Sequence, residues 1–185
     1  MIMLYTRKGD DGMSGLFGTK ERLPKNNPIY NVLGTLDELN SLLGLCRAQS
    51  THHQCFDIHT ALYHIQQCLF VVQAEFAGAP KELEQKDVNE IENTIDTIEI
   101  ILQGPCDFVV PGSTELSALL DCARAVSRRA ERAAIEACSW RNISPATRAY
   151  LNRLSSLLYA LARYAAAHEN VQESAPTYIT ANSKK

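Results

Sequence analysis

Apolar residues recur at every third or fourth position through most of this chain, in five long stretches that Gly and Pro separate. In the second stretch, for example, Leu62, Ile65 and Leu69 follow one another at this interval. The interval is that of an α-helix with one buried face, and no segment of useful length alternates as a strand would. Long helices with short links pack naturally as an up-and-down bundle. We therefore predict an all-α fold with five helices, at about Ile29 to Ala48, Gln54 to Ala77, Glu84 to Leu102, Ser113 to Cys138 and Ser144 to His168.

The ends of these stretches carry recognisable signals. Gly104 and Pro105 stop the third stretch. Ser113 is expected to cap the fourth helix, because a hydroxyl at that position accepts from a free backbone N–H group. Ser144 followed by Pro145 predicts the start of the fifth helix.

The length of 185 residues fits a single domain. We expect an N-terminal loop over residues 1–27 and a helical domain over residues 28–169. Residues 170–185 are polar and include Pro176, which predicts a flexible C-terminal tail.

Composition restricts the partners and the compartment. The net charge of −3 gives no general reason to expect binding to nucleic acid or to an anionic membrane. No apolar run approaches the ~20 residues of a membrane span, and the N-terminus lacks a signal-peptide pattern. The six cysteines contain no C-x-x-C pair, so a zinc site is not expected. Reduced cysteines within helical patterns favour a cytoplasmic protein.

Four glycines stand at every third position near the start of the chain, at Gly9, Gly12, Gly15 and Gly18. Glycine lets successive backbone N–H groups converge on one point. Such groups, with nearby hydroxyls and cations, suit a polyphosphate, and an Asp among them can hold its metal ion. A mobile polar tail is the alternative interpretation of the same segment.

The fourth helix is expected to carry a row of three arginines, because Arg124, Arg128 and Arg132 recur every four residues. At ~100° per residue they form one ridge, which borders the apolar stripe of the helix. Like charges at this spacing repel by a few tenths of a kcal/mol per pair, and no acid in that row relieves them. A phosphate chain or an acidic helix of another subunit would account for the row. A solvated basic face with partly buried stems is the alternative.

Polar residues in the first and fifth helices add further candidates. Asp37 and Ser41 lie one turn apart, and Asn152 interrupts the fifth helix at a cost of several tenths of a kcal/mol relative to Ala. That cost favours a hydrogen-bonding role, although a solvent-facing Asn would also be tolerated. None of the five histidines is expected to be a ligand, because His52 and His53 fall at a turn between helices and the other three lack i, i+4 partners.

Five segments in fixed order together resemble a known family. They are Tyr5-Thr6-x-x-Gly9-Asp10-x-Gly12, Asp37-Glu38-Leu39-Asn40-Ser41, Phe108-Val109-Val110-Pro111-Gly112, Arg128-Arg129-Ala130-Glu131-Arg132 and Tyr150-Leu151-Asn152-Arg153-Leu154-Ser155. The chain resembles the propanediol-utilisation type of ATP:cob(I)alamin adenosyltransferase, also called corrinoid adenosyltransferase, over about residues 4 to 168. The resemblance implies a ferritin-like five-helix bundle, a homotrimer, and active sites between neighbouring subunits. It also implies that Mg²⁺-ATP and a corrinoid are co-substrates, which give adenosylcobalamin and triphosphate.

The resemblance also implies roles for residues, position by position. Arg128 and Arg132 match the arginines that hold the triphosphate, with Glu131 close by, and Asn152 matches an asparagine that contacts the nucleotide. Asp37 and Arg124 resemble a pair that meets across the subunit boundary. Phe108, followed by Val109, resembles the aromatic that packs beside the corrin and displaces its lower axial ligand. The N-terminal segment resembles the loop that folds over ATP, and its candidate contacts are Thr6, Arg7, Lys8, Gly9, Asp10, Gly12, Ser14 and Lys25.

The chain departs from the family pattern in one place. The family tends to have a Gly two residues before an Arg, whereas Gly18 lies four residues before Arg22. The roles of Arg22 and Lys25 are therefore less firmly implied. No protein residues are assigned to the metal, since Mg²⁺ is expected to be held mainly by the phosphates of ATP.

Other functions are compatible with the same residues. A helical scaffold that binds a nucleotide without chemistry would need the same arginines, and a delivery protein could hand adenosylcobalamin to a partner enzyme. A cobalamin reductase and an adenosylcobalamin-dependent enzyme are the partners the resemblance suggests. A di-iron bundle is not expected because the chain lacks Glu-x-x-His on two helices, and the G-x-x-x-x-G-K-[ST] loop of ordinary ATPases is also missing.

Overall fold

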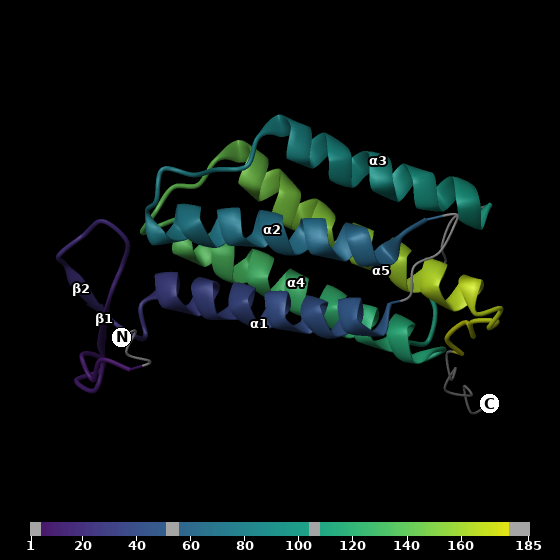
Figure 1. Ribbon diagram of the computed structural model, residues 1–185, viewed down its shortest axis with the longest axis horizontal. Helices are drawn as coiled ribbons and strands as arrows, with labels where there is room; N and C mark the ends of the chain where they lie inside the picture. Colours follow the sequence, from purple (N-terminus) through teal and green to yellow (C-terminus); the bar gives the residue numbers. More distant parts are fainter. Residues whose placement is uncertain (1–4, 51–55, 104–107, 178–185) are drawn as a thin grey trace, which may run out of the picture.

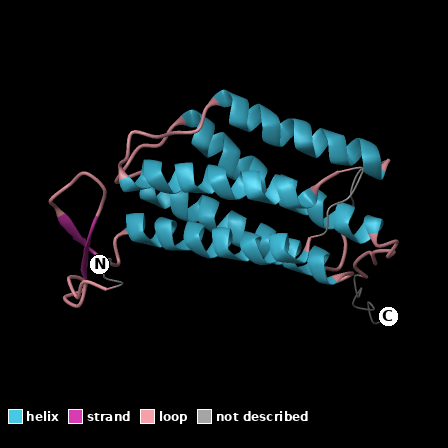
Figure 2. Cartoon of the chain, in the orientation of Figure 1, coloured by secondary structure: helices cyan, strands magenta, loops and turns pink. Residues whose placement is uncertain are grey.

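The computed structural model describes residues 5–50, 56–103 and 108–177. These residues form five helices and one small hairpin, as Figures 1 and 2 show. The prediction of a mainly helical chain with five helices is confirmed. The elements are β1 (Met13–Gly15), β2 (Arg22–Pro24), α1 (Pro28–Gln49), α2 (Ile58–Ala77), α3 (Gln85–Leu102), α4 (Glu115–Ala137) and α5 (Pro145–His168).

The helices alternate in direction along the chain and lie side by side in a bundle (Figure 1). Helix α1 packs on α2 and α4, α4 packs on α5, and α5 packs on α3. The packing of α1 on α4 and of α3 on α5 joins helices that are distant in the sequence. No helix in the described part of the chain is long and apolar enough to cross a membrane.

Side chains that accept from free backbone N–H groups fix the helix starts. Asn27 caps α1, accepting from the N–H of Ile29 at 3.0 Å. The prediction that Ser113 caps α4 is wrong by one residue, because Thr114 takes that position. The hydroxyl of Thr114 accepts from the N–H of Ser117, and the hydroxyl of Ser117 accepts from the N–H of Thr114. This reciprocal pair satisfies two free donors at once, which a cap at Ser113 would not do.

The predicted start of the second helix, at Gln54, lies outside the described residues. The helix begins at Ile58, after Asp57, whose carboxylate accepts from the N–H of Thr60. The fifth helix begins as predicted, with Ser144 as its cap and Pro145 as its first residue.

The core runs along the shared faces of α1, α4 and α5. Small residues of α4, including Ala123, Ala130 and Ala134, are buried there and let the neighbouring helices approach closely. Cys46 and Cys68 are buried as predicted, and burial raises the pKa of the Cys46 thiol to about 12. Cys122, in contrast, is exposed. Cys55 and Cys106 lie outside the described residues.

The N-terminal segment contains a feature that the sequence did not predict. Strands β1 and β2 pair in antiparallel fashion, with Ser14 opposite Leu23. Each strand has three residues, which is too short for an alternating pattern to be recognised. The expected Gly-rich loop is therefore a twisted hairpin, set at one end of the bundle beside the start of α1 (Figure 1).

The end of α2 holds the start of α5. The carboxylate of Glu75 accepts from the N–H of Ser144 and from the hydroxyl of Thr147, both at 2.5 Å. Gly78 ends α2 with a φ of 93°, in the left-handed region that favours glycine. A Cβ at this position would lie 2.7 Å from Nη1 of Arg141.

We expect Gly78→Ala to lower the free energy of unfolding by about 1–2 kcal/mol, because alanine is strained in this conformation. Gly44→Ala is the matched control, since Gly44 lies inside α1 and an added Cβ there would meet only Gln66, at 3.5 Å. That control should raise stability by up to about 1 kcal/mol. Urea unfolding of both variants, followed by circular dichroism, tests this difference; equal stabilities would contradict it.

Candidate functional site

The three arginines predicted to form a ridge lie along α4, and the structure pairs only one of them. Arg124 is half-buried, and its Nε lies 3.8 Å from Oδ1 of Asp121, one turn earlier. Arg128 and Arg132 are exposed and make no hydrogen bond or ion pair with any other described residue. Two guanidinium groups one turn apart, without an acidic partner, attract an anion with several oxygen atoms. Asp121 is a partner of Arg124 that was not predicted, although its spacing of three from Arg124 is a readable signal.

A polar pair lies beside these arginines. Nδ2 of Asn152 donates to Oε1 of Glu131 at 2.7 Å, and Oδ1 of Asn152 accepts from Nη1 of Arg153 at 2.7 Å. The Nε of Arg153 also donates to Glu92 of α3, at 3.0 Å. The structure thus brings the predicted site residues Glu131 and Asn152 together, and neighbouring charges hold the amide of Asn152 in one orientation.

A groove of about 540 Å³ opens next to the arginine row. Arg124 and Arg128 line it from α4, Tyr159 lines it from α5, and Phe108 and Val109 line it from the loop before α4. The side chain of Phe108 is 82% exposed, so the ring is open to a ligand in the groove. The groove therefore has a cationic wall and an apolar rim. Its described lining residues are Ile95, Glu99, Phe108, Val109, Pro111, Asp121, Arg124, Arg128, Ser155, Ser156, Tyr159, Ala160 and Arg163.

Asp37 and Arg124 do not meet within one chain. Asp37 is exposed on α1, and no hydrogen bond or ion pair among the described residues joins it to Arg124. Its neighbour Glu38 instead pairs with Arg129 of α4. The implied contact between Asp37 and Arg124 across a subunit boundary stays a prediction.

Arg22 holds the N-terminal hairpin in shape. Its guanidinium donates to both carboxylate oxygens of Asp11, at 2.7 and 2.9 Å, and to the carbonyl oxygens of Met13 and Lys8. The hydrogen bond from Arg22 lowers the pKa of Asp11 below its ordinary value. The hydrogen bonds of Arg22 among the described residues all lie within its own chain, and so this structure gives it a structural role in the hairpin.

The ammonium group of Lys25 lies against the backbone of Gly9. Its Nζ donates to the carbonyl oxygen of Gly9 at 2.7 Å, and a Cβ on Gly9 would lie 3.0 Å from the same Nζ. A side chain at position 9 would crowd the end of the lysine, which would have to shift to keep this bond. An ammonium group keeps further donors after one such bond, so Lys25 retains the capacity to bind a phosphate.

The other N-terminal candidates lie on the exposed surface around this point. Arg7 has a φ of 59°, and its guanidinium lies 5.3 Å from the centre of the Tyr5 ring. The hydroxyl of Thr6 accepts from the N–H of Lys8 at 3.4 Å. Thr6, Arg7, Lys8, Asp10 and Gly12 are exposed, while Gly9 and Ser14 are half-buried.

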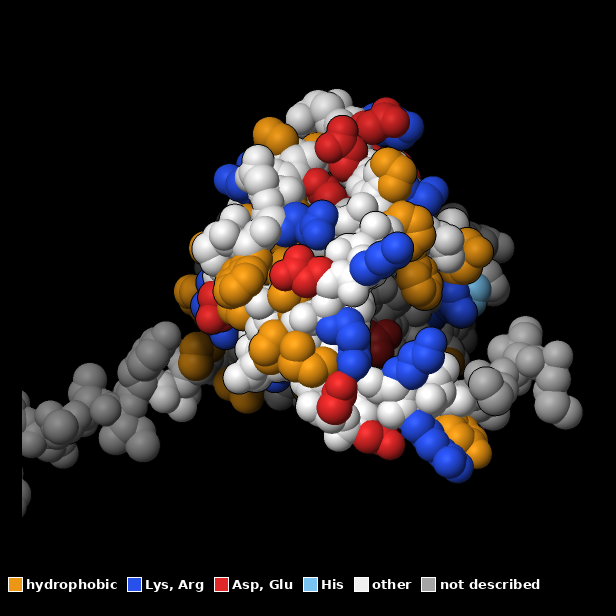
Figure 3. All heavy atoms as spheres, turned by 90° about the vertical axis from the view of Figure 1, so that its left-hand side faces the viewer, with side chains coloured by type: hydrophobic (Ala, Val, Ile, Leu, Met, Phe, Trp, Pro, Cys, Tyr) orange, Lys and Arg blue, Asp and Glu red, His pale blue; other side chains and the backbone are white. Residues whose placement is uncertain are grey.

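Within the described ranges, no hydrogen bond or ion pair joins the N-terminal candidates to Arg128, Arg132 or Asn152. The predicted contacts to ATP thus fall into two groups, one in the N-terminal segment and one on α4 and α5. Figure 3 views the molecule from the hairpin end and shows Lys and Arg side chains gathered around a hollow in this face.

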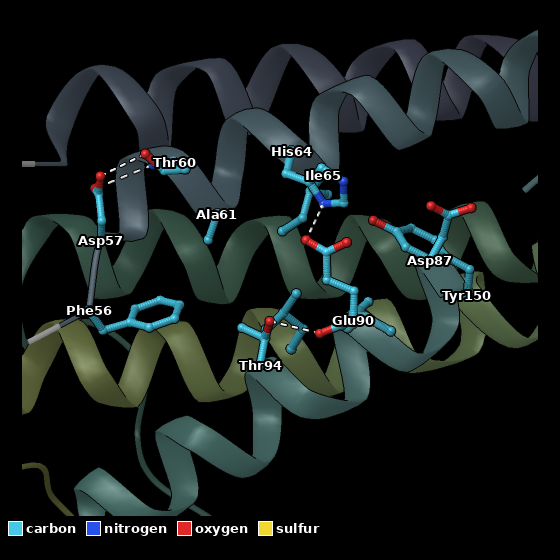
Figure 4. Close-up of a pocket in the computed structure, with 12 residues that line it drawn as sticks. Phe56, Asp57, Thr60, Ala61, His64, Ile65, Asp87, Glu90, Thr94 and Tyr150 are labelled. Atoms are coloured by element: carbon cyan, nitrogen blue, oxygen red, sulfur yellow. Dashed lines mark hydrogen bonds and ion pairs between the residues drawn. The ribbon is translucent and has the colours of Figure 1, made fainter. Parts of the chain in front are cut away.

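A second cavity, of about 300 Å³, lies between α2, α3 and α5 (Figure 4). Its polar side chains already pair with each other: Nδ1 of His64 lies 3.5 Å from Oε1 of Glu90, and Asp57 binds Thr60. Asp57, Asp87 and Glu90 give this cavity acidic walls, which repel a phosphate chain. The groove beside α4 is therefore the better candidate for a nucleotide, and Figure 4 shows none of the predicted site residues in this second cavity.

No group of three or more His, Cys, Asp or Glu side chains in the described part of the chain is placed to hold a metal ion. Asp10 is an exposed carboxylate of the N-terminal segment that Arg22 does not bind. It fits a cation that is bound chiefly by a nucleotide's phosphates, because Mg²⁺ commonly takes only one or two carboxylates in such sites.

Known proteins are similar to this chain in both sequence and fold. The family model described as cobalamin adenosyltransferase matches residues 4–165. The corrinoid adenosyltransferase PduO of Salmonella typhimurium is 37% identical over 171 residues, which cover 88% of this chain and 49% of that protein. A corrinoid adenosyltransferase of Citrobacter freundii is 36% identical, with 88% and 94% covered. The chain spans about half the length of the PduO relatives from Salmonella typhimurium and Citrobacter freundii.

A solved structure agrees with these matches. A variant of the PduO-type ATP:corrinoid adenosyltransferase from Lactobacillus reuteri, complexed with cobalamin and ATP, aligns with a TM-score of 0.85 at 30% identity. The alignment covers 93% of this chain and 98% of that one. The fold is a helical bundle with an arginine-lined groove, and the family model and the solved structure both match it over most of its length. The chain belongs to the cobalamin adenosyltransferase family.

Proposed function

We propose that this protein transfers the 5′-deoxyadenosyl group of ATP to the cobalt of cob(I)alamin. Arg128 and Arg132 carry this proposal, because they lie one turn apart without an acidic partner among the described residues, and Arg128 lines a groove with an apolar rim. The relatives named above are corrinoid adenosyltransferases, and the solved structure from Lactobacillus reuteri is complexed with cobalamin and ATP.

The reaction requires no base or covalent residue from the protein. Cob(I)alamin is a strong nucleophile that uses its electron pair to form a bond between cobalt and C5′ of ATP. The bond between C5′ and the phosphate oxygen breaks, and triphosphate leaves with that electron pair. The metal is formally oxidised from Co(I) to Co(III). The protein must align the two substrates, a contribution of up to ~7–11 kcal/mol in favourable cases.

The arginine row stabilises the departing triphosphate. Negative charge grows on the leaving oxygen in the transition state, and Arg128 and Arg132 present fixed positive groups to it. A single well-placed donor of this kind contributes about 3–4 kcal/mol. Mg²⁺ supplies further positive charge on the phosphates when it is bound with ATP, and Asp10 is the residue suited to contact it. Asn152, oriented by Glu131 and Arg153, recognises the nucleotide.

Phe108 acts on the corrinoid side of the groove. Cobalt is hard to reduce to Co(I) while an axial ligand donates electrons to it. An exposed aromatic side chain at the rim, followed by Val109, excludes water and the lower ligand from that face of the corrin. A cobalamin reductase would supply the electron, and an adenosylcobalamin-dependent enzyme would take the product.

The site is completed by a second chain in a homotrimer of ferritin-like bundles. The absence of any bond, among the described residues, between the N-terminal segment and the arginines of α4 supports this proposal. The exposed position of Asp37, free to meet Arg124 of a neighbour, supports it as well. Cyclic assemblies repeat one interface, so a trimer would hold three equivalent sites.

A mass measurement tests the assembly. Light scattering after size exclusion should give three times the 20.5 kDa of one chain. Asp37→Asn should weaken the trimer at low protein concentration, while Asp96→Asn, on an exposed position of α3, should not. A monomer at micromolar concentration would contradict a shared site.

Arg128→Ala should lower turnover by about 10²–10³-fold, since it removes one donor to the triphosphate. The assay is anaerobic and mixes protein, Mg²⁺-ATP and chemically reduced cob(I)alamin while the cobalt absorption spectrum is followed. Arg47→Ala is the control, because Arg47 lies outside the groove and packs on Tyr63. Turnover of Arg128→Ala within twofold of wild type would refute the phosphate role. ATP binding by the wild type without conversion would favour a nucleotide-binding scaffold.

Phe108→Ala should retain ATP binding and lose most turnover when the assay starts from cob(II)alamin and a reductant. The loss should be smaller when pre-reduced cob(I)alamin is supplied, because the proposed role of Phe108 precedes alkylation. Ile100→Ala, at another exposed apolar residue, is expected to behave as wild type. Full activity of Phe108→Ala from cob(II)alamin would rule out this role.

A further inference from the structure

A buried ion cluster that the proposed reaction does not use joins α4, α5 and the C-terminal segment. Arg163 of α5 is only 4% exposed. Its Nη2 donates to Oδ2 of Asp121 at 2.6 Å, and its Nε lies 2.9 Å from Oε2 of Glu173. The side chains of Asp121 and Glu173 are 5% and 15% exposed. Burying charges is costly, so a buried ion pair is weak evidence for a gain in stability. Its geometry does show which segments are held against each other.

The cluster is balanced only when Glu173 is present. Asp121 and Glu173 carry two negative charges, which match the two positive charges of Arg163 and Arg124. Burial raises the pKa of Glu173, and the adjacent guanidinium of Arg163 opposes that shift. Without Glu173, Arg163 would keep Asp121 as a partner but share it with Arg124.

Glu173 is the one member of this cluster that lies outside the helices. The sequence predicted a loose tail from residue 170, yet this part of the tail is tied to the bundle. The next residue, Ser174, accepts from the N–H of Val110 at 2.8 Å through its carbonyl oxygen. Figure 1 shows the segment after α5 beside the start of α4, at the end of the bundle away from the hairpin.

Val110 belongs to the loop that carries Phe108. Phe108 and Val109 form the rim of the groove, whereas Asp121 and Arg163 line the same groove from the helices. The ring of Tyr159 lies between the two arginines, 4.7 Å from the guanidinium of Arg163 and 5.9 Å from that of Arg124. The cluster therefore connects the floor of the groove, through two successive residues of the C-terminal segment, to its rim.

We propose that Glu173 is a positioning residue, which through Arg163 holds residues 173–174 against the Phe108 loop and so fixes Phe108 at the rim of the groove. This inference rests on the proposed role of Phe108. Misplacing a reacting or aligning group by about 1 Å can cost up to ~10²-fold in rate, so a loosened loop should reduce turnover without altering ATP binding.

Hydrogen exchange tests the contact directly. In full-length Glu173→Gln, the amide of Val110 should exchange at least about tenfold faster than in wild type, while amides inside α4 keep their protection. Glu169→Gln is the matched control, because Glu169 is exposed four residues earlier. Glu173→Asp keeps the charge and should give an intermediate rate, which preserves the test if Glu173→Gln is poorly folded. Unchanged exchange at Val110 in both Glu173 variants would overturn the proposal.

Turnover tests the consequence. Glu173→Gln should lower kcat from cob(II)alamin about tenfold with an unchanged KM for ATP. In a Phe108→Ala background the same substitution should cause no further loss. Wild-type turnover despite faster exchange, or an equal loss in both backgrounds, would overturn the positioning role. If Phe108→Ala alone is fully active, the proposed role of Phe108 fails, and the exchange at Val110 still decides whether Glu173 holds the loop.

Discussion

Positive charge that the chain does not neutralise organises this structure. Helix α4 buries alanines against α1 and α5, and this close packing places its arginines at the edge of the core. Asp121 forms an ion pair with Arg124, whereas Arg128 and Arg132 are exposed and have no partner among the described residues. Like charges one turn apart destabilise an isolated helix slightly. In the proposed function a bound triphosphate would reverse the sign of that contribution, so one row of arginines would account for both the mild repulsion and the binding.

The groove divides naturally along α4. The row from Arg124 to Arg132 spans about 12 Å, because each residue of a helix rises ~1.5 Å. Phe108 lies near the Arg124 part of the row, and the Glu131–Asn152 pair lies near the other part. In the proposed function, the corrinoid would lie at the groove beside Phe108 and the nucleotide would extend along α4 toward the Glu131–Asn152 pair. The ion cluster around Arg163, in its proposed role, would then hold the Phe108 loop on the corrinoid side of the groove.

The sequence predicted what depends on local order and missed what depends on distant pairing. Helical periodicity and the Ser144–Pro145 signal located the helices to within a few residues. The hairpin escaped because three-residue strands have no readable period. Ser113 and Thr114 are chemically alike, and only the reciprocal bond with Ser117 decides between them. Arg163 pairs with Asp121 and Glu173, which are too far along the chain for helical spacing to indicate. Site roles came mostly from the family resemblance, since spacing alone left a solvated arginine face as an open alternative.

The central claim is that one site takes its N-terminal loop and its arginines from different chains, and subunit mixing tests it most directly. Gly9→Val should disable the loop, since its side chain displaces Lys25, and Arg128→Ala disables the other half. Each variant alone should be nearly inactive. Co-expression of the two in equal amounts should restore about a quarter of wild-type activity, because random assembly pairs an intact loop with an intact arginine in that fraction of the interfaces. Mixtures no more active than the separate variants would show that each site is built within one chain.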